Sequence, residues 1–100
     1  DKVGKYEPDY LDTFGRYDGI KLDLWEGGVR MPTIVRWPSM IKAGSESTAP
    51  SQFHDWMATF CDLSGVPAPA VSDGVSMVPS LTSQGEQPLG IVYSEFISPA

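Results

Sequence analysis

The sequence has few features that would cross-link the chain or attach it to a charged surface. Its 100 residues include a single cysteine, Cys61, which excludes an intrachain disulfide and a cysteine-based zinc site. Seven Lys and Arg residues stand against thirteen Asp and Glu residues, so the net charge is −6. Nucleic acids and anionic membranes both require a basic surface, so neither is an expected partner. No apolar run approaches the roughly 18–20 residues that span a bilayer.

Turn-forming residues, in contrast, are abundant. Ten Gly and nine Pro residues predict many loops and short elements rather than a helical bundle. A hydrophobic fraction of 41%, with 11% aromatic residues, is enough for a small core. The length corresponds to about one domain or a piece of one. We therefore expect a single partial domain over residues 1–100.

Hydrophobic periodicity and turn residues predict the elements of this domain. Residues 1–20 follow no period, and we expect a long loop there with a short helical turn near 10–14. Apolar and polar residues alternate between Pro32 and Pro38, which is typical of a short strand. In chain order we predict a loop over 1–20, then a Lys/Trp-Glu-Gly-Gly turn and strand over 21–38, in which the strand is 32–37. A helix over 51–64, a short helix over 76–81 and a strand over 90–96 follow.

The helix over 51–64 has the clearest pattern. Ser51 is the expected N-cap, Asp55 suits the first turn, and Gly65 followed by Pro67 ends the helix. Five large apolar residues recur at helical spacing and predict one buried face. They are Phe53, Trp56, Met57, Phe60 and Leu63.

The densest group of functional side chains lies in residues 21–38, Lys-Leu-Asp-Leu-Trp-Glu-Gly-Gly-Val-Arg-Met-Pro-Thr-Ile-Val-Arg-Trp-Pro. In an extended backbone Lys21, Asp23 and Trp25 project to one side. The following Gly-Gly pair allows a tight turn or a close approach to a ligand. A lysine ammonium offers three N–H donors and suits sulfate or phosphate. Spacing alone is also typical of a solvated surface lysine.

This segment resembles part of the sulfatase family, through Lys-x-x-x-Trp-Glu-Gly-Gly-Val-Arg-Met-Pro and a later Trp-Pro. Further pieces resemble the family in the same order, so the similarity covers about residues 19–97. They are Ile-Lys-Ala-Gly-Ser at 41–45, His-Asp-Trp-Met-Ala-Thr at 54–59 with Leu-Ser-Gly-Val-Pro at 63–67, Asp-Gly-Val-Ser-Met-Val-Pro-Ser-Leu at 73–81, and Tyr-Ser-Glu-Phe at 93–96.

The resemblance implies an α/β fold, in which the chain is a fragment of an alkaline-phosphatase-like mixed-sheet sandwich with short strands, one main helix and long loops. It also implies hydrolysis of sulfate esters by a formylglycine- and calcium-dependent mechanism. The family's last active-site lysine matches Lys21, whose implied role is to bind the sulfate. Trp25, Gly27, Gly28 and Arg30 are then expected to shape the turn that places this lysine.

The chain also departs from the family. Leu22, Asp23 and Leu24 stand where small polar residues are usual, and Asp23 is expected to pair with Lys21 or to repel its ligand. Cys61 lies on the predicted helix, outside the Cys/Ser-x-Pro/Ala-x-Arg motif that gives formylglycine, so we expect a packing cysteine. No Asp-Asp pair or Asp-Asn-Gly loop occurs, so no metal ligand is assigned.

The remaining polar residues receive structural interpretations. Arg30 is expected to form an ion pair or to bind a carbonyl, and Glu26 to cap or pair within the same turn. His54 is expected to be a surface or capping residue of the helix. Asp73 with Gly74 signals a turn.

We therefore expect the nucleophile and the calcium ligands in a part of the protein outside this chain, and we expect the chain alone to be inactive and to bind no calcium. Uncovered strand edges and an uncovered helix face predict self-association. The family resemblance suggests an exported or lysosomal protein. Two alternatives stay open: a phosphatase or phosphonate hydrolase of the same superfamily, and a non-catalytic acidic binding domain.

Overall fold

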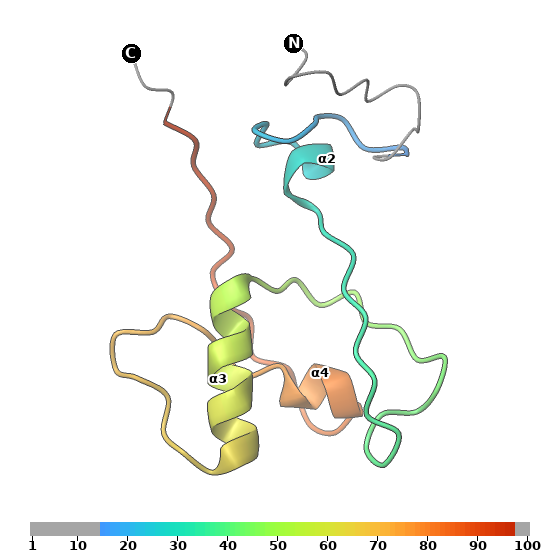
Figure 1. The fold of residues 1–100 in the computed structure, drawn as a ribbon, viewed down its shortest axis with the longest axis vertical. Coiled ribbons are helices and arrows are strands. Elements are labelled where there is room, and N and C mark those ends of the chain that lie inside the picture. Colours follow the sequence, from blue (N-terminus) through green and yellow to red (C-terminus); the bar gives the residue numbers. More distant parts are fainter. Residues whose placement is uncertain (1–14, 98–100) are drawn as a thin grey trace. The chain divides into compact units, whose positions relative to one another are not determined.

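A computed structural model describes residues 15–97 of the chain (Figure 1). Within them lie three helices, α2 at Glu26–Val29, α3 at Phe53–Ser64 and α4 at Val78–Thr82. The chain divides into two compact units, one with described residues 15–33 and 93–97 and one with residues 34–92. The helical turn expected at 10–14 lies outside the described residues, and residues 15–20 are irregular.

Helix α3 occupies most of the range predicted for the main helix. It begins after Gln52, which forms a capping box with Asp55, so the N-cap lies one residue after the expected Ser51. The shift follows from the Asp55 carboxylate, which accepts the Gln52 N–H at 2.7 Å. The helix ends at Gly65, whose φ of 68° is the left-handed conformation that glycine adopts without a steric penalty.

The buried face of α3 is not the predicted apolar one. Asp55, Ala58 and Thr59 are the buried residues of this helix. Phe53 is 76% exposed and Phe60 60% exposed, so the prediction of a buried large-apolar face is wrong for this chain. The physical reason is that no element of the described residues covers that face: α3 contacts α4, and the residues that it buries are small or polar.

Helix α4 lies near the short helix predicted over 76–81. Pro79 stands in its first turn, where a missing N–H costs nothing. Its last turn is closed by Thr82, whose hydroxyl donates to the Val78 carbonyl at 2.8 Å. It ends at Ser83, which has a left-handed φ of 56°.

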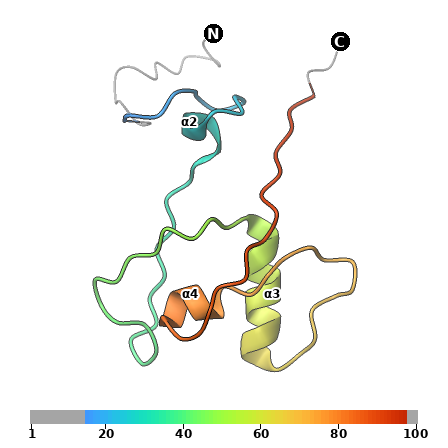
Figure 2. The same ribbon diagram turned by 180° about the vertical axis from the view of Figure 1, so that it is seen from behind.

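The strands predicted over 32–37 and 90–96 are absent from the described part of the chain. Both segments are drawn as irregular backbone, without strand arrows, in either view (Figure 1, Figure 2). A strand requires a hydrogen-bonded neighbour, and an alternating pattern cannot supply one. The mixed sheet is therefore not confirmed by residues 15–97. No helix in this range is both long and apolar enough to cross a membrane.

Candidate functional site

Lys21 lies at the tip of a tight turn in the unit that contains α2. The Asp23 N–H donates to the Ile20 carbonyl at 2.9 Å, which closes a four-residue turn over 20–23. The Ile20 N–H donates to the Asp23 carboxylate, also at 2.9 Å. Lys21 and Leu22 are the two central residues of this turn, and the Lys21 side chain is exposed. The turn therefore projects an ammonium group on a short, doubly closed loop.

This geometry replaces the extended approach predicted for residues 21–25. A tight turn between Lys21 and Asp23 removes the two-residue alternation that would place both side chains on one side. The Asp23 carboxylate accepts the Ile20 N–H, and no ion pair joins it to Lys21 among residues 15–97. Of the two alternatives expected for Asp23, pairing with Lys21 is therefore wrong, and repulsion of the ligand of Lys21 stays a prediction. The Asp23 carboxylate accepts a hydrogen bond from a backbone N–H, that of Ile20, instead of pairing with the lysine.

Leu22 adopts a backbone conformation that its side chain does not favour. Its φ is 85°, in the left-handed region where a Cβ crowds the following carbonyl. A turn with a positive φ at its third residue usually places Gly or Asn there. A non-glycine residue held in this region indicates that the surrounding contacts determine the backbone path.

Both of the predicted site-shaping glycines lie against the backbone of residues 18–23, the loop that contains this turn. A Cβ on Gly27 would lie 2.8 Å from the Asp18 carbonyl oxygen, and a Cβ on Gly28 would lie 2.9 Å from the Asp23 carbonyl carbon. The Gly27 N–H donates to the Asp18 carbonyl at 2.7 Å. Because real Cβ atoms do not approach backbone this closely, only glycine permits the contact between α2 and the loop.

Arg30 follows α2 and is held by two neighbours. Its guanidinium forms an ion pair with Glu26, one turn earlier, which is one of the two roles expected for each residue. The same guanidinium lies over the Tyr17 ring, 4.4 Å from the ring centroid. Glu26 raises the pKa of Arg30 through this hydrogen bond, so Arg30 stays cationic. These contacts connect α2 to the 15–20 segment.

Tyr17 was not recognised from the sequence, although it lies between two arginines. Arg16 donates to the Tyr17 hydroxyl at 3.3 Å, and its guanidinium lies 5.3 Å from the ring centroid. The hydrogen bond from Arg16 lowers the pKa of Tyr17 below its usual value of 10.0. A Tyr beside Arg in a loop has no periodic signal, so sequence patterns did not identify this cluster.

The five predicted site residues therefore lie in one unit. Trp25 precedes α2 as its N-cap residue, and Gly27, Gly28 and Arg30 lie in or directly after this short helix. The loop that presents Lys21 packs on the same helix through the glycines. Chemically, this arrangement presents one exposed lysine ammonium, suited to an anionic oxygen group, on a backbone with little freedom.

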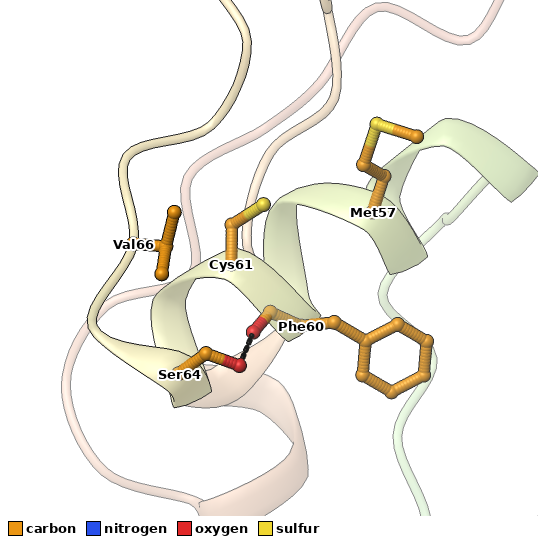
Figure 3. Close-up of a pocket in the computed structure, with 5 residues that line it drawn as sticks. All are labelled: Met57, Phe60, Cys61, Ser64 and Val66. Carbon is orange, nitrogen blue, oxygen red and sulfur yellow. Dashed lines mark hydrogen bonds between the residues drawn. The ribbon is translucent and has the colours of Figure 1, made fainter.

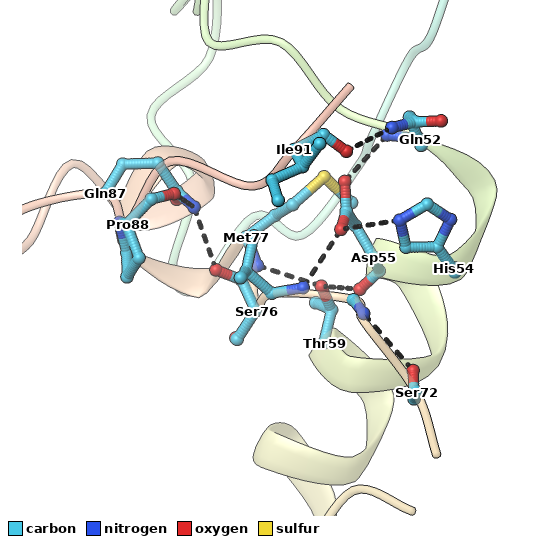
Figure 4. A network of polar contacts seen from close by, with 12 residues as sticks. Gln52, His54, Asp55, Thr59, Ser72, Ser76, Met77, Gln87, Pro88 and Ile91 are labelled. Carbon is cyan, nitrogen blue, oxygen red and sulfur yellow. Dashed lines mark hydrogen bonds and ion pairs between the residues drawn. The ribbon is translucent and has the colours of Figure 1, made fainter. Parts of the chain in front are cut away.

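The second unit contains a polar network centred on Asp55, which is 4% exposed (Figure 4). Its carboxylate accepts the Val75 N–H at 3.0 Å as well as the Gln52 N–H. Thr59 donates to the Asp55 carbonyl at 2.6 Å and accepts the Met77 N–H at 2.9 Å. Asp55 thus joins α3 to the segment before α4, which is a structural role.

Further polar contacts extend this network. The Gln52 side chain donates to the Ile91 carbonyl at 2.7 Å. His54 Nε2 lies 3.9 Å from Asp55 Oδ1, at the helix start, as expected for a surface histidine. Gly74 passes so close to α3 that a Cβ would lie 2.7 Å from the His54 carbonyl carbon. The Asp73-Gly74 turn signal therefore marks a close contact between the segment before α4 and the helix.

An apolar hollow of about 510 Å³ lies on α3 and the loop that follows it (Figure 3). Met57, Phe60, Cys61, Ser64 and Val66 line it. Cys61 is a free, half-buried thiol here, consistent with a packing cysteine. Ser64 donates its hydroxyl to the Phe60 carbonyl at 2.7 Å, so no nucleophile and base meet in the hollow. It carries no arrangement for catalysis.

Acidic and metal-binding side chains are scattered over the described residues. No three His, Cys, Asp or Glu side chains within 15–97 gather closely enough to hold a metal ion. Calcium takes six to eight oxygen ligands in proteins. The residues described therefore do not fit a calcium site.

Comparisons with known proteins add the following findings. Residues 13–98 match a family model described as N-sulphoglucosamine sulphohydrolase, C-terminal. The chain is 37% identical to a steryl-sulfatase of Homo sapiens over 75 residues, 73% of this chain and 13% of that protein. It is 40% identical to an N-acetylglucosamine-6-O-sulfatase of Bacteroides thetaiotaomicron over 79 residues, 79% of this chain and 14% of that protein.

A third relative is an ulvan-active sulfatase of Formosa agariphila, 33% identical over 73 residues. That match covers 73% of this chain and 15% of the relative. The chain thus spans 13% to 15% of the length of these three relatives. No solved structure matches it significantly.

Proposed function

Because the chain belongs to the sulfatase family, whose C-terminal family model it matches over residues 13–98, we propose that it is part of a longer enzyme that hydrolyses sulfate esters. We call this longer protein the whole protein. The match across most of the chain is the observation that carries the proposal. The similar proteins support it, since each is named as a sulfatase.

In the whole protein, Lys21 binds the sulfate group of the substrate. Its exposed ammonium on a tight turn suits the anionic oxygens of a sulfate, and a fixed cation stabilises the charge that develops on those oxygens during hydrolysis. Trp25, Gly27, Gly28 and Arg30 shape the turn from α2. The close backbone contacts of the two glycines support this role.

The nucleophile and the metal belong to the remainder of the whole protein. The family's formylglycine comes from a Cys or Ser in a motif that the sequence of this chain lacks, and Cys61 lies within α3. The described residues do not fit a calcium site. We therefore assign formylglycine and calcium to the part outside this chain, and we expect the chain alone to be inactive and to bind no calcium.

The whole protein also supplies what the two alternating segments lack. We propose that residues 32–37 and 90–96 pair with strands of a mixed, alkaline-phosphatase-like sheet. The same sandwich covers the exposed apolar side of α3, where Phe53, Met57 and Phe60 are more than half exposed. Without it, the isolated chain associates with itself through this side. By family membership we expect the whole protein to be exported or lysosomal.

Hydrolysis assays on the whole protein test the proposed function. The substrates are an aryl sulfate, a steroid sulfate, a 6-O-sulfated N-acetylglucosamine and the phosphate analogue of each. We expect release of sulfate from at least one ester and much slower release of phosphate from its analogue. Preferred phosphate release would favour the phosphatase or phosphonate hydrolase alternative. A folded whole protein that hydrolyses none of them would favour a non-catalytic acidic binding domain.

The isolated chain provides a second test of where the nucleophile lies. It is expected to release no sulfate from an aryl sulfate, with or without added calcium. Metal-dependent turnover by the chain alone would contradict the assignment of nucleophile and metal to the remainder of the whole protein.

A further inference from the structure

We propose that Asp23 is a positioning residue for Lys21, acting through the backbone turn that both share. The inference rests on the proposed function, in which Lys21 binds the sulfate. Asp23 itself touches no substrate in this proposal. Its carboxylate fixes the direction in which the lysine side chain leaves the backbone.

The contacts of the turn over 20–23 carry the first step. Its two end residues are bonded twice, through the Asp23 N–H to the Ile20 carbonyl and through the Ile20 N–H to the Asp23 carboxylate, each at 2.9 Å. The first bond is available to any residue at position 23 except proline, which lacks a backbone N–H. The second requires a side chain with an acceptor oxygen at this distance from its backbone, which Asp and Asn have.

The conformation of Leu22 carries the second step. A φ of 85° is unfavourable for leucine. The hydrogen bond from the Ile20 N–H to the Asp23 carboxylate, which we call the Asp23 clamp, holds the turn closed, and without it Leu22 would relax toward negative φ. Relaxation would rotate the peptide between Lys21 and Leu22 and redirect the lysine. The Asp23 clamp opposes this relaxation directly, since it joins Ile20 and Asp23, the residues on either side of Lys21 and Leu22. Leu22 is thus the strained member of the turn and Asp23 the residue that holds it.

The contact with α2 carries the third step. Gly28 lies against the carbonyl groups of Ile20 and Asp23, the two residues that the clamp joins. The turn is therefore fixed to the helix at its base and free at its tip, where Lys21 stands. A long, flexible side chain loses less entropy on binding when its backbone is already fixed. Misplacement of a charge by about 1 Å can cost about a hundredfold in rate.

The test uses turnover by the whole protein on whichever sulfate ester it hydrolyses. Asp23→Ala is expected to lower kcat roughly ten- to a hundredfold. Asp23→Asn, which keeps an acceptor oxygen in the same place, is expected to restore most of the rate. A charge effect of Asp23 on the substrate would instead make the Asn and Ala variants alike, which would overturn the proposal.

A double-mutant cycle with Lys21→Ala separates positioning from a general structural role. If Asp23 acts through the lysine, Asp23→Ala has little further effect on kcat once Lys21 is Ala. An equal loss in both backgrounds would overturn the inference. A wild-type rate for Lys21→Ala alone would instead overturn the proposed role of Lys21, so the two failures are distinguishable.

Variants at Leu22 test the same turn without touching the carboxylate. Leu22→Gly removes the penalty of the positive φ and is expected to keep kcat and raise the melting temperature. Leu22→Val places a β-branched residue at that φ and is expected to lower kcat. These variants decide the question even if Asp23→Ala fails to fold, because a wild-type kcat for Leu22→Val contradicts the proposed dependence of Lys21 on the turn.

Discussion

The polar centre of the second unit gives a quantitative prediction about stability. Asp55→Ala removes the acceptor of two backbone N–H groups, those of Gln52 and Val75. The first is a helix cap, and its loss costs about 1 kcal/mol. The second joins α3 to the segment before α4, and leaving that donor without a partner costs about 1–3 kcal/mol. The expected loss is therefore about 2–4 kcal/mol of local stability.

Hydrogen exchange of the whole protein measures this loss where it arises. Because each 1.4 kcal/mol is a factor of ten, backbone amides of residues 72–77 should exchange roughly 30- to 700-fold faster in Asp55→Ala. Asp55→Asn keeps one acceptor oxygen, so the exchange rates of these amides should lie between those of Asp55→Ala and those of the wild type. Asp62 is the matched control, since it lies on the same helix, is exposed and has one hydroxyl partner, Ser76, at 2.6 Å. Equal exchange in Asp55→Ala and Asp62→Ala would refute the central role of Asp55.

Three further predictions concern other contacts. Gly27→Ala places a Cβ 2.8 Å from the Asp18 carbonyl oxygen and should lower sulfate-ester turnover by the whole protein. Gly90→Ala, whose Cβ would meet two side-chain atoms, a Val75 methyl at 3.1 Å and an Asp55 carboxylate oxygen at 3.8 Å, should not; equal rates would contradict the close-approach argument. Arg16→Gln should raise the lowered pKa of Tyr17, measured by NMR titration of labelled tyrosine, and an unchanged pKa would count against the Arg16 contact. The lowered pKa adds stability to the folded chain above the usual pKa of 10.0, and this gain is lost as pH falls through the lowered pKa, so the gain should be smaller in Arg16→Gln. The isolated chain should self-associate in light scattering and Phe60→Asp should reduce this; a wild-type monomer at high concentration would exclude association through α3.

The position of the main helix was predictable because its signals are local. Apolar residues at helical spacing and Gly65 indicated α3, and the helix runs to the residue before that glycine. The buried side was not predictable in the same way. Large apolar residues indicate the side that prefers burial, but the described chain offers no element to cover it. The small side, with Thr59 only 1% exposed, packs instead.

The candidate site was predictable in residue type but not in geometry. Lys21 and the two glycines were identified through the family resemblance, whereas the turn around them depends on the positive φ of Leu22, which leucine itself does not favour. The Asp55 network escaped prediction because its partner Val75 lies twenty residues away in the sequence. The prediction of the strands failed for a related reason, since the alternation in 32–37 specifies a strand only when another strand lies beside it.

Turnover by Lys21→Ala in the whole protein tests the central claim most directly. Lys42→Ala is the matched control, because Lys42 is likewise an exposed loop lysine but belongs to the other unit. With a sulfate ester that the wild type hydrolyses, Lys21→Ala is expected to lower kcat by about a hundred- to a thousandfold, as loss of a charge contact to the reacting group does, while Lys42→Ala leaves it unchanged. A kcat near the wild-type value for Lys21→Ala would contradict the claim that this lysine binds the sulfate.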